Sequence, residues 1–526
     1  MCFDNEANSQ TMNRKDVFSA QINSGYSCKG DSIVLGSAML DGETISANQV
    51  RVPLKTMNRH GLIAGATGTG KTKTLQVISE QLSEKGIPVL LMDVKGDLSG
   101  IAVPGEEKPF ITERHAKIGL PYSVKGFPVE LMTISKQDGV RLRATVSEFG
   151  PVLLSRILDL NDTQGGVLAV IFKYCDDNKL ALLDLKDLKS VVQYVTEEGK
   201  KEIEDNYGRI STSTTGIIMR KILELEQQGA DQFFGELSFD IRDLMRCDRN
   251  GNGYINIIRL TDIQDKPKLF STFMLSLLAE VYSQMPEKGD AEKPELVIFI
   301  DEAHLIFSQA SKTLLDQIEN IVKLIRSKGV GVFFVTQNPT DVPNGILAQL
   351  GLKVQHALRA FTAVDRKAIK LTAENYPISE FYKTDEIITS LGIGEALVTA
   401  LSEKGIPTPL AATMLRTPMS RMDILSDHEI SLLNRSSDLV SKYSQTIDRE
   451  SAYEILGKKI EGIEKDAADD KARKEWENTR NEEWERERRG GRTTTRRSRS
   501  IAAPVIKVLT SATFIRGVLG ILKKVM

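Results

Sequence analysis

The residues best suited to chemistry form one continuous stretch near the start of the chain. This stretch matches the G-x-x-x-x-G-K-[ST] pattern of a phosphate-binding loop. Its members are Gly65, Ala66, Thr67, Gly68, Thr69, Gly70, Lys71 and Thr72. Glycines let such a loop turn its backbone N–H groups towards a phosphate chain. We expect Lys71 to reach the β- and γ-phosphates of a nucleotide and the hydroxyl of Thr72 to bind Mg²⁺.

The sequence around this loop predicts the elements that would position it. The apolar run at 61–64 is typical of a buried parallel strand, and residues 74–82 have apolar side chains at helical spacing. A strand before the loop and a helix after it would direct the helix N-terminus at the phosphates. This context argues against a chance match in a glycine-rich turn.

A second candidate group, Asp301 and Glu302, directly follows the apolar run 296–300. An Asp at the end of a buried strand suits contact with Mg²⁺. A Glu beside it suits a general base that orients an attacking water. The alternative is an Asp that caps the next helix. A phosphate loop in the same chain favours the catalytic interpretation.

Other polar residues near predicted strand ends are weaker candidates. Gln337 ends the strand predicted over 330–336 and suits a sensor of the γ-phosphate, although Asn338-Pro339 also predicts a polar turn there. Arg326 and Arg359 are candidates for an arginine finger, which stabilises transition-state charge and often comes from a neighbouring subunit. The alternative for a single arginine is a surface or ion-paired position.

Two further residues are candidate contacts to the nucleotide. Arg59 precedes the first strand of the loop region, and Asp93 ends the strand predicted over 88–93. Asp93 and Gly96 also match the D-x-x-G pattern of GTPases. The chain has no N-K-x-D sequence to recognise guanine, which favours adenine.

A partial calcium-loop motif lies at 248–253. Its twelfth position is Arg259 rather than the glutamate that a calcium loop needs, so we expect a turn.

The chain alternates predicted strands with helical stretches, which indicates an α/β fold with a mostly parallel sheet. The predicted strands are 33–35, 61–64, 88–93, 254–260, 296–301, 330–336, 353–359 and 395–399.

The predicted organisation has six parts. They are a poorly ordered N-terminus (1–30), the first part of the core (31–138), an all-helical insertion (139–250), the second part of the core (251–435), a charged helical segment (436–489), and a basic flexible stretch with an amphipathic helix (490–526). The last helix could dock on the core, pair with another subunit or touch a membrane surface. Docking on the core is the interpretation we favour.

Composition sets broad limits on function. The chain has 526 residues, of which 41% are hydrophobic and 27% charged, as in globular proteins. It has 69 Lys plus Arg and 71 Asp plus Glu, so a nucleic-acid site would need a local basic patch, such as the seven arginines in 486–499. Four scattered cysteines, no signal peptide and no apolar run of ~20 residues predict a cytoplasmic protein.

Together these motifs resemble the HerA-like group of P-loop ATPases, related to the FtsK translocases, and most of all its YjgR-type branch. The resemblance spans roughly residues 50–526. The segments that carry it are 58–72, 92–100, 301–304, 336–339 and 516–520.

The resemblance implies a RecA-like core with an inserted helical bundle, a hexameric ring, and ATP hydrolysis coupled to movement on double-stranded DNA. It implies ATP and Mg²⁺ as ligands. The roles that it implies are phosphate and Mg²⁺ binding for Lys71 and Thr72, Mg²⁺ binding for Asp301, water activation for Glu302, a sensor for Gln337, an inter-subunit finger for Arg326 and a nearby basic contact for Arg59.

The chain departs from HerA proteins at its N-terminus, where those proteins carry a β-barrel that docks a nuclease. Only 64 residues precede Gly65, and their β signal is weak, so we expect neither a full barrel nor a nuclease partner. Two alternatives to a DNA motor stay open. One is a ring ATPase that acts on proteins or a secretion-type assembly, and the other is an ATP-dependent switch without motor activity.

Overall fold

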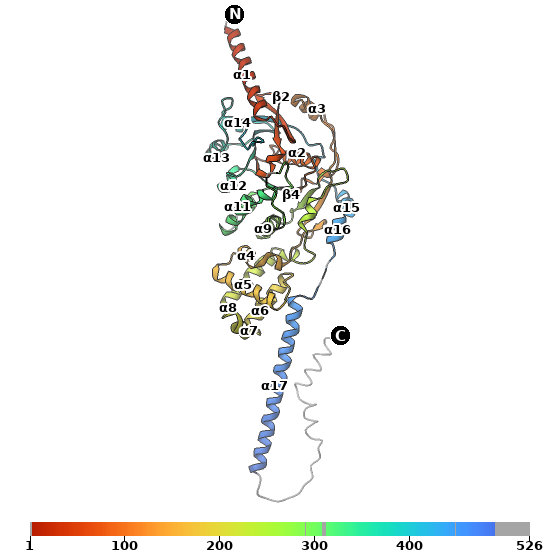
Figure 1. Ribbon diagram of the computed structural model, residues 1–526, viewed down its shortest axis with the longest axis vertical. Helices are drawn as coiled ribbons and strands as arrows, with labels where there is room; N and C mark the ends of the chain where they lie inside the picture. The colour runs from red at the N-terminus through yellow and green to blue at the C-terminus, as the bar shows by residue number, and fades with distance from the viewer. Residues whose placement is uncertain (1–2, 290, 308–311, 446, 448, 490–526) are drawn as a thin grey trace. The chain divides into compact units, whose positions relative to one another are not determined.

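One mixed sheet forms the framework of the molecule (Figure 1). The computed structural model describes residues 3–289, 291–307, 312–445, 447 and 449–489. In these residues the sheet order is β2-β1-β12-β11-β10-β3-β9-β8-β4-β7-β5-β6. The strands are β1 Ser32–Leu40, β2 Glu43–Pro53, β3 Gly61–Ala64, β4 Val89–Asp93, β5 Val129–Thr133, β6 Val140–Arg141, β7 Ile255–Arg259, β8 Leu296–Ile300, β9 Val330–Thr336, β10 Leu352–His356, β11 Glu395–Thr399 and β12 Ala411–Leu415.

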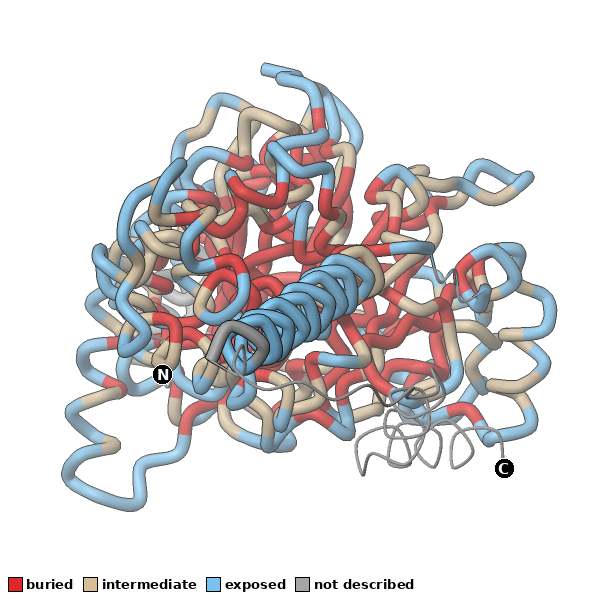
Figure 2. Tube along the Cα trace, turned by 90° about the horizontal axis from the view of Figure 1, so that it is seen from below, coloured by how far each residue is buried: buried red, intermediate tan, exposed pale blue. Residues whose placement is uncertain are grey.

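The sheet has a parallel part and an antiparallel part. All strands from β10 through β3 to β6 run parallel, whereas β11, β12, β1 and β2 extend the β10 edge in antiparallel pairs. Strands β3, β4, β8 and β9 are buried at every residue, because helices cover parallel sheets on both faces. Figure 2 shows the buried residues in red. The predicted α/β fold with a mostly parallel sheet is confirmed.

Helices connect the strands and cover the sheet. Those outside the insertion are α1 Phe3–Gly25, α2 Lys71–Glu84, α3 Pro109–Ile118, α9 Pro267–Gln284, α10 His304–Phe307, α11 Lys312–Ile325, α12 Asn344–Leu347, α13 Ala363–Glu374, α14 Thr384–Ser390, α15 Asp427–Arg435, α16 Asp438–Tyr443 and α17 Ala452–Arg489. Short 3₁₀ turns are η1 Leu54–Arg59, η2 Ser99–Ala102, η3 Ala230–Gln232, η4 Ile241–Met245, η5 Arg326–Lys328 and η6 Pro339–Asp341.

Five helices between β6 and β7 gather into one cluster, in the part of the chain predicted as a helical insertion (Figure 1). They are α4 Val146–Ile157, α5 Asp162–Asp177, α6 Leu185–Thr196, α7 Lys200–Tyr207 and α8 Thr212–Gln227. Capping boxes at Thr145, Asn161 and Asp184 start three of them. Strand β6 lies inside the predicted insertion, so the helices begin a few residues later than the boundary at 139.

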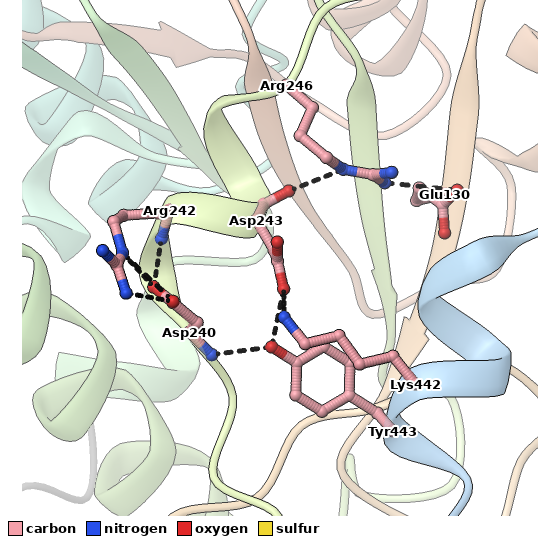
Figure 3. A network of polar contacts seen from close by, with 7 residues as sticks. All are labelled: Glu130, Asp240, Arg242, Asp243, Arg246, Lys442 and Tyr443. Atoms are coloured by element: carbon pink, nitrogen blue, oxygen red, sulfur yellow. Dashed lines mark hydrogen bonds and ion pairs between the residues drawn. The ribbon is translucent and has the colours of Figure 1, made fainter.

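A polar network anchors the end of this insertion to the rest of the molecule (Figure 3). The hydroxyl of Tyr443 in α16 accepts the backbone N–H of Asp240 at 3.0 Å and donates to Asp243 Oδ2 at 2.6 Å. Lys442 contacts the same carboxylate. Arg246 extends the network to Glu130 in β5 at 3.3 Å. The network therefore connects η4, a strand of the sheet and α16.

Residues 248–253 form the turn that the sequence analysis predicts before β7. The Oδ1 atom of Asp248 accepts the backbone N–H groups of Asn250 at 2.9 Å and Asn252 at 2.8 Å. The side chain therefore closes a local turn.

The N-terminus differs from its prediction as a poorly ordered segment. Residues 3–25 form helix α1, and Phe18, Ile22 and Tyr26 are buried. The Tyr26 hydroxyl lies 2.9 Å from the carbonyl of Val398 and 2.7 Å from that of Pro409. The sequence signal was the four-residue spacing of these side chains, which the many polar residues around them obscured.

The chain divides into two units, one that ends at Leu456 and one that begins at Gly457. Within the second unit, residues 457–489 continue α17 as a highly charged helix in which Trp476 and Trp484 are exposed. The predicted basic stretch and amphipathic helix at 490–526 lie outside the described residues. In the part of the chain that the structure describes, no helix is long and apolar enough to cross a membrane.

Candidate active site

The phosphate loop connects β3 to α2 at the carboxyl edge of the parallel strands. Gly65, Gly68 and Gly70 have φ angles of 153°, 78° and 113°, which residues other than glycine rarely adopt. The backbone N–H of Gly65 donates to the carbonyl of Thr336 at 3.3 Å, and that of Ala66 donates to Ala357 at 2.8 Å. The loop is therefore fixed to the strands on both sides of β3.

Lys71 is the first residue of α2 and is buried. Its ammonium donates to the carbonyl oxygens of Gly65 at 2.7 Å and Ala66 at 3.2 Å, so it lies over the loop. Burial lowers the pKa of Lys71, and the nearby Lys95 charge adds to this. The charges of Asp301 and Glu302 oppose the shift, which places both carboxylates within electrostatic reach of the loop lysine.

Asp301 and Glu302 follow β8, which is separated from β3 only by β9. The N–H of Ala303 donates to the carbonyl of Val335 at 2.9 Å, which fixes this turn to the end of β9. Asp301 is buried, and its Oδ2 atom has no hydrogen-bond partner among the described residues. Burial raises the pKa of Asp301 to about 7, although the Lys95 ammonium opposes the rise. A buried carboxylate oxygen without a donor fits a Mg²⁺ ligand, either direct or through water.

Glu302 adopts a left-handed backbone conformation with φ of 48°. Such a conformation costs energy in a residue with a side chain, and it is often found at functional sites. The buried carboxylate of Glu302 contacts the ammonium of Lys95 and lies 3.2 Å from Nδ1 of His304. The strained turn therefore directs the candidate base at the same edge of the sheet as the phosphate loop.

Asp93 lies at the end of β4, next to β8 in the sheet. Its Oδ1 atom accepts the N–H groups of Gly96 at 2.6 Å and Asp97 at 3.2 Å, and its Oδ2 atom accepts that of Leu98 at 3.1 Å. Burial raises the pKa of Asp93 to about 6. Asp93 thus organises the turn that carries Lys95.

His356 ends β10 and supports the phosphate loop from the other side. Its Nε2 atom lies 2.9 Å from the hydroxyl of Thr74 in α2. Burial, together with the Lys71 charge, lowers the pKa of His356 to about 4. The ring is therefore neutral at pH 7 and connects β10 to the first turns of α2.

Gln337 and Arg359 lie at the carboxyl edge of the sheet, after β9 and β10. Gln337 follows β9, directly after the Thr336 carbonyl that binds the loop. Arg359 is exposed after β10, and its Nη1 atom donates to the carbonyl of Thr389 at 2.9 Å. Both residues are thus on the side of the sheet where the phosphate loop and the carboxylates lie.

The structure does not bring Arg59 or Arg326 to this edge. Arg59 precedes β3 at its amino end, where its carbonyl accepts the N–H of Gly351 at 2.8 Å. Arg326 precedes β9 at the same amino edge, and its charge acts on His60. Within one chain, the length of the strands separates both arginines from the phosphate loop.

A family model described as "Helicase HerA-like C-terminal" matches residues 39–525. The chain belongs to the HerA-like C-terminal helicase family. At the level of the family it is a P-loop ATPase. The resemblance inferred from the motifs is confirmed.

Curated proteins with similar sequences carry helicase names. The DNA double-strand break repair helicase HerA of Sulfolobus acidocaldarius is 24% identical over 365 residues, which cover 68% of this chain and 66% of that protein. A probable helicase of Methanocaldococcus jannaschii is 26% identical over 391 residues, with coverages of 69% and 67%. The HerA-like chain thus spans about two thirds of the length of these relatives.

The bacterial conjugative coupling protein TrwBdeltaN70, in its unbound monoclinic form, has a similar solved structure. Its TM-score is 0.51 at 14% sequence identity, and the alignment covers 77% of this chain and 95% of that one. This similarity supports the P-loop ATPase fold of the HerA-like chain.

Two groups of the HerA-like site, Lys95 and His356, were not predicted as site residues. Lys95 was placed in the GTPase-like pattern and in the segment 92–100 without a role, and His356 was placed only within a strand. A cation two residues beyond a strand end was the available signal for Lys95. Its proximity to Glu302 depends on the neighbouring positions of β4 and β8, which spacing along the chain does not reveal.

Proposed function

We propose that the protein binds ATP with Mg²⁺ and hydrolyses it. The observation that carries the proposal is the position of Lys71, Asp301 and Glu302 at one edge of the sheet, within mutual electrostatic reach. Residues 65–72 would bind the phosphates, and Thr72 and Asp301 would hold the metal. Bound Mg²⁺ would neutralise charge on the phosphate oxygens.

In this mechanism Glu302 orients the attacking water by accepting a hydrogen bond from it. The water oxygen forms a bond to the γ-phosphorus while the bond from that phosphorus to the β,γ-bridging oxygen breaks. The proton lost by the water passes to Glu302 and then to the phosphate product. Lys71 and the backbone N–H groups of the loop stabilise charge on the oxygens, and Gln337 reports the presence of the γ-phosphate.

We propose further that hydrolysis drives movement on double-stranded DNA by a homo-oligomeric, hexameric ring in the cytoplasm. The family membership and the helicase names of the curated relatives support this proposal. The position of Arg326 at the edge opposite to its own phosphate loop supports a role in a neighbouring subunit's site. Arg59 lies at the same amino edge as Arg326. Arg359 is the candidate for an arginine that acts in the chain's own site.

The charge composition favours a second candidate function, an ATPase that acts on proteins or works as a switch. A DNA motor needs Lys and Arg along its track, whereas this chain has almost equal numbers of basic and acidic residues.

Steady-state ATP hydrolysis with and without double-stranded DNA tests these proposals, with Lys71→Ala as the inactive control. A DNA motor is expected to show a strong increase in turnover on DNA that weakens with salt. Hydrolysis that no DNA stimulates would support the protein-directed alternative. Absence of hydrolysis in the wild type under all conditions would overturn the ATPase proposal itself.

A further inference from the structure

Lys95 lies inside the candidate site, yet the mechanism above gives it no role. Its ammonium contacts Oε1 of Glu302, and its charge acts on both Asp301 and Lys71. The site thus contains a second lysine among the groups assigned to the metal, the water and the γ-phosphate.

A rigid turn holds the backbone of Lys95. Three backbone N–H groups of residues 96–98 donate to the carboxylate of Asp93. The carbonyl of Val94 accepts a hydrogen bond from Nε2 of Gln264 at 2.5 Å, and Gly96 has φ of 80°. The Cα of Lys95 is therefore fixed at the carboxyl edge of the sheet, and the flexible side chain extends the ammonium from this point.

Lys95 keeps its positive charge at this position. Burial lowers the pKa of Lys95, but the contact with Glu302 and the charge of Asp301 outweigh burial and raise it above its ordinary value. Its ammonium has three donor hydrogens, and the contact with one carboxylate oxygen does not use all of them. The remaining donors can bind phosphate oxygens next to the water that Glu302 orients.

The three candidate arginines, Arg59, Arg326 and Arg359, do not supply a cation at this point of the chain's own site. Arg59 and Arg326 lie at the amino edge of the sheet. Arg359 follows β10, which is next to β3 on the side away from β8, and it donates to Thr389. Lys95 is on the β8 side, where the γ-phosphate has to lie if Glu302 orients its attacking water.

We propose that Lys95 is a catalytic residue that contacts the γ-phosphate oxygens and stabilises the charge that develops on them during hydrolysis. This inference rests on the proposed ATPase function. Lys95 keeps its proton and forms no covalent bond. The bonds made and broken are those of the water attack described above, and the stabilisation is electrostatic.

The test compares Lys95→Gln and Lys95→Arg with the control Lys136→Gln. Lys136 is an exposed lysine that follows β5 at the same edge of the sheet. Single-turnover hydrolysis of Mg–ATP measures the chemical step. Binding of Mg–ADP, with and without aluminium fluoride as a mimic of the transferred phosphoryl group, measures recognition without turnover. Circular dichroism and thermal unfolding confirm that each variant is folded.

We expect Lys95→Gln to bind Mg–ADP within about twofold of the wild type and to lose about 10²–10³-fold in the single-turnover rate. It should also lose the tighter ADP binding that aluminium fluoride produces. Lys95→Arg should restore part of both properties, and Lys136→Gln should match the wild type.

Two results would overturn the inference. One is a folded Lys95→Gln variant that hydrolyses ATP at the wild-type rate or faster. The other is a slow variant that still binds ADP–aluminium fluoride as tightly as the wild type, because Lys95 would then only position Glu302. A wild-type protein without hydrolysis would instead refute the proposed function, so the two failures are distinguishable.

Discussion

A Cβ atom on Gly65 would lie 2.5 Å from the Cβ of His356, closer than side chains approach in folded proteins. The first glycine of the phosphate loop is therefore required by the neighbouring strand as well as by its φ of 153°. This contact brings β10 against the loop.

Substitution of Gly65 by Ala should destabilise the protein. Overpacking of about 1–3 kcal/mol would add to backbone strain of about 1–3 kcal/mol. Chemical denaturation measures the change in the free energy of unfolding. The control is Gly68→Ala, because Gly68 has φ of 78° but a Cβ added there would meet nothing within 4 Å among the described residues. Equal losses in the two variants would show that contact with His356 is not the cause.

Glu302→Gln should retain ATP binding and lose turnover by about 10²–10⁴-fold, because the amide cannot accept the proton of the attacking water. Equilibrium binding of a fluorescent ATP analogue and steady-state hydrolysis measure the two properties. Glu292→Gln, an exposed position in the ion pair with Lys55, is the matched control. Wild-type turnover in Glu302→Gln would refute the assignment of the base.

Mg²⁺ affinity should fall with decreasing pH because of Asp301. The pKa of this carboxyl is raised to about 7, so the group takes up a proton as the pH falls through 7. A metal ligand has to be deprotonated, so the half-saturating Mg²⁺ concentration should rise up to about tenfold per pH unit below this value. Titration of Mg²⁺-dependent nucleotide binding at several pH values measures this half-saturating concentration. Asp301→Asn should remove this dependence; an unchanged pH profile in that variant would contradict the prediction.

Tyr443→Phe should destabilise the protein by about 1–3 kcal/mol, because the backbone N–H of Asp240 loses its acceptor and Asp243 loses a donor. Urea denaturation measures the change. Tyr453→Phe is the control, since Tyr453 is 44% exposed and its ring, which Lys186 covers at 3.5 Å, is kept in Phe. Similar effects of the two substitutions would mean that the network in Figure 3 contributes little to stability.

The parallel strands from β10 to β7 could be predicted from the sequence because long apolar runs mark strands that are buried on both faces. Residues 296–300 and 330–336 are continuous apolar runs, which is the pattern of such strands. Strand β2 was missed because polar residues alternate along it and one face is exposed. Strand β5 was missed because Glu130 interrupts a run of only five residues, and its carboxylate is buried against Arg246 and Ser437.

The site could be predicted only where its residues are local in sequence. The loop at 65–72 and the pair Asp301–Glu302 are each continuous, and strand ends identify them. Lys95 and His356 lie in the site because of the order of the strands in the sheet, in which β4 is next to β8 and β10 is next to β3. Neither residue has a sequence neighbour that reveals this proximity.

The helical insertion leaves the sheet after β6 and the chain re-enters it at β7, with only β5 between them. These strands run parallel, so the connection has to return from the carboxyl edge to the amino edge of the sheet, which takes a dozen or more residues. The strands β3, β8 and β9 lie on the other side of β4, but helix α4 of the insertion packs against α9 and α11 of the core. A replacement for the insertion would therefore have to return the chain to the amino edge of the sheet and to cover the same surfaces of α9 and α11.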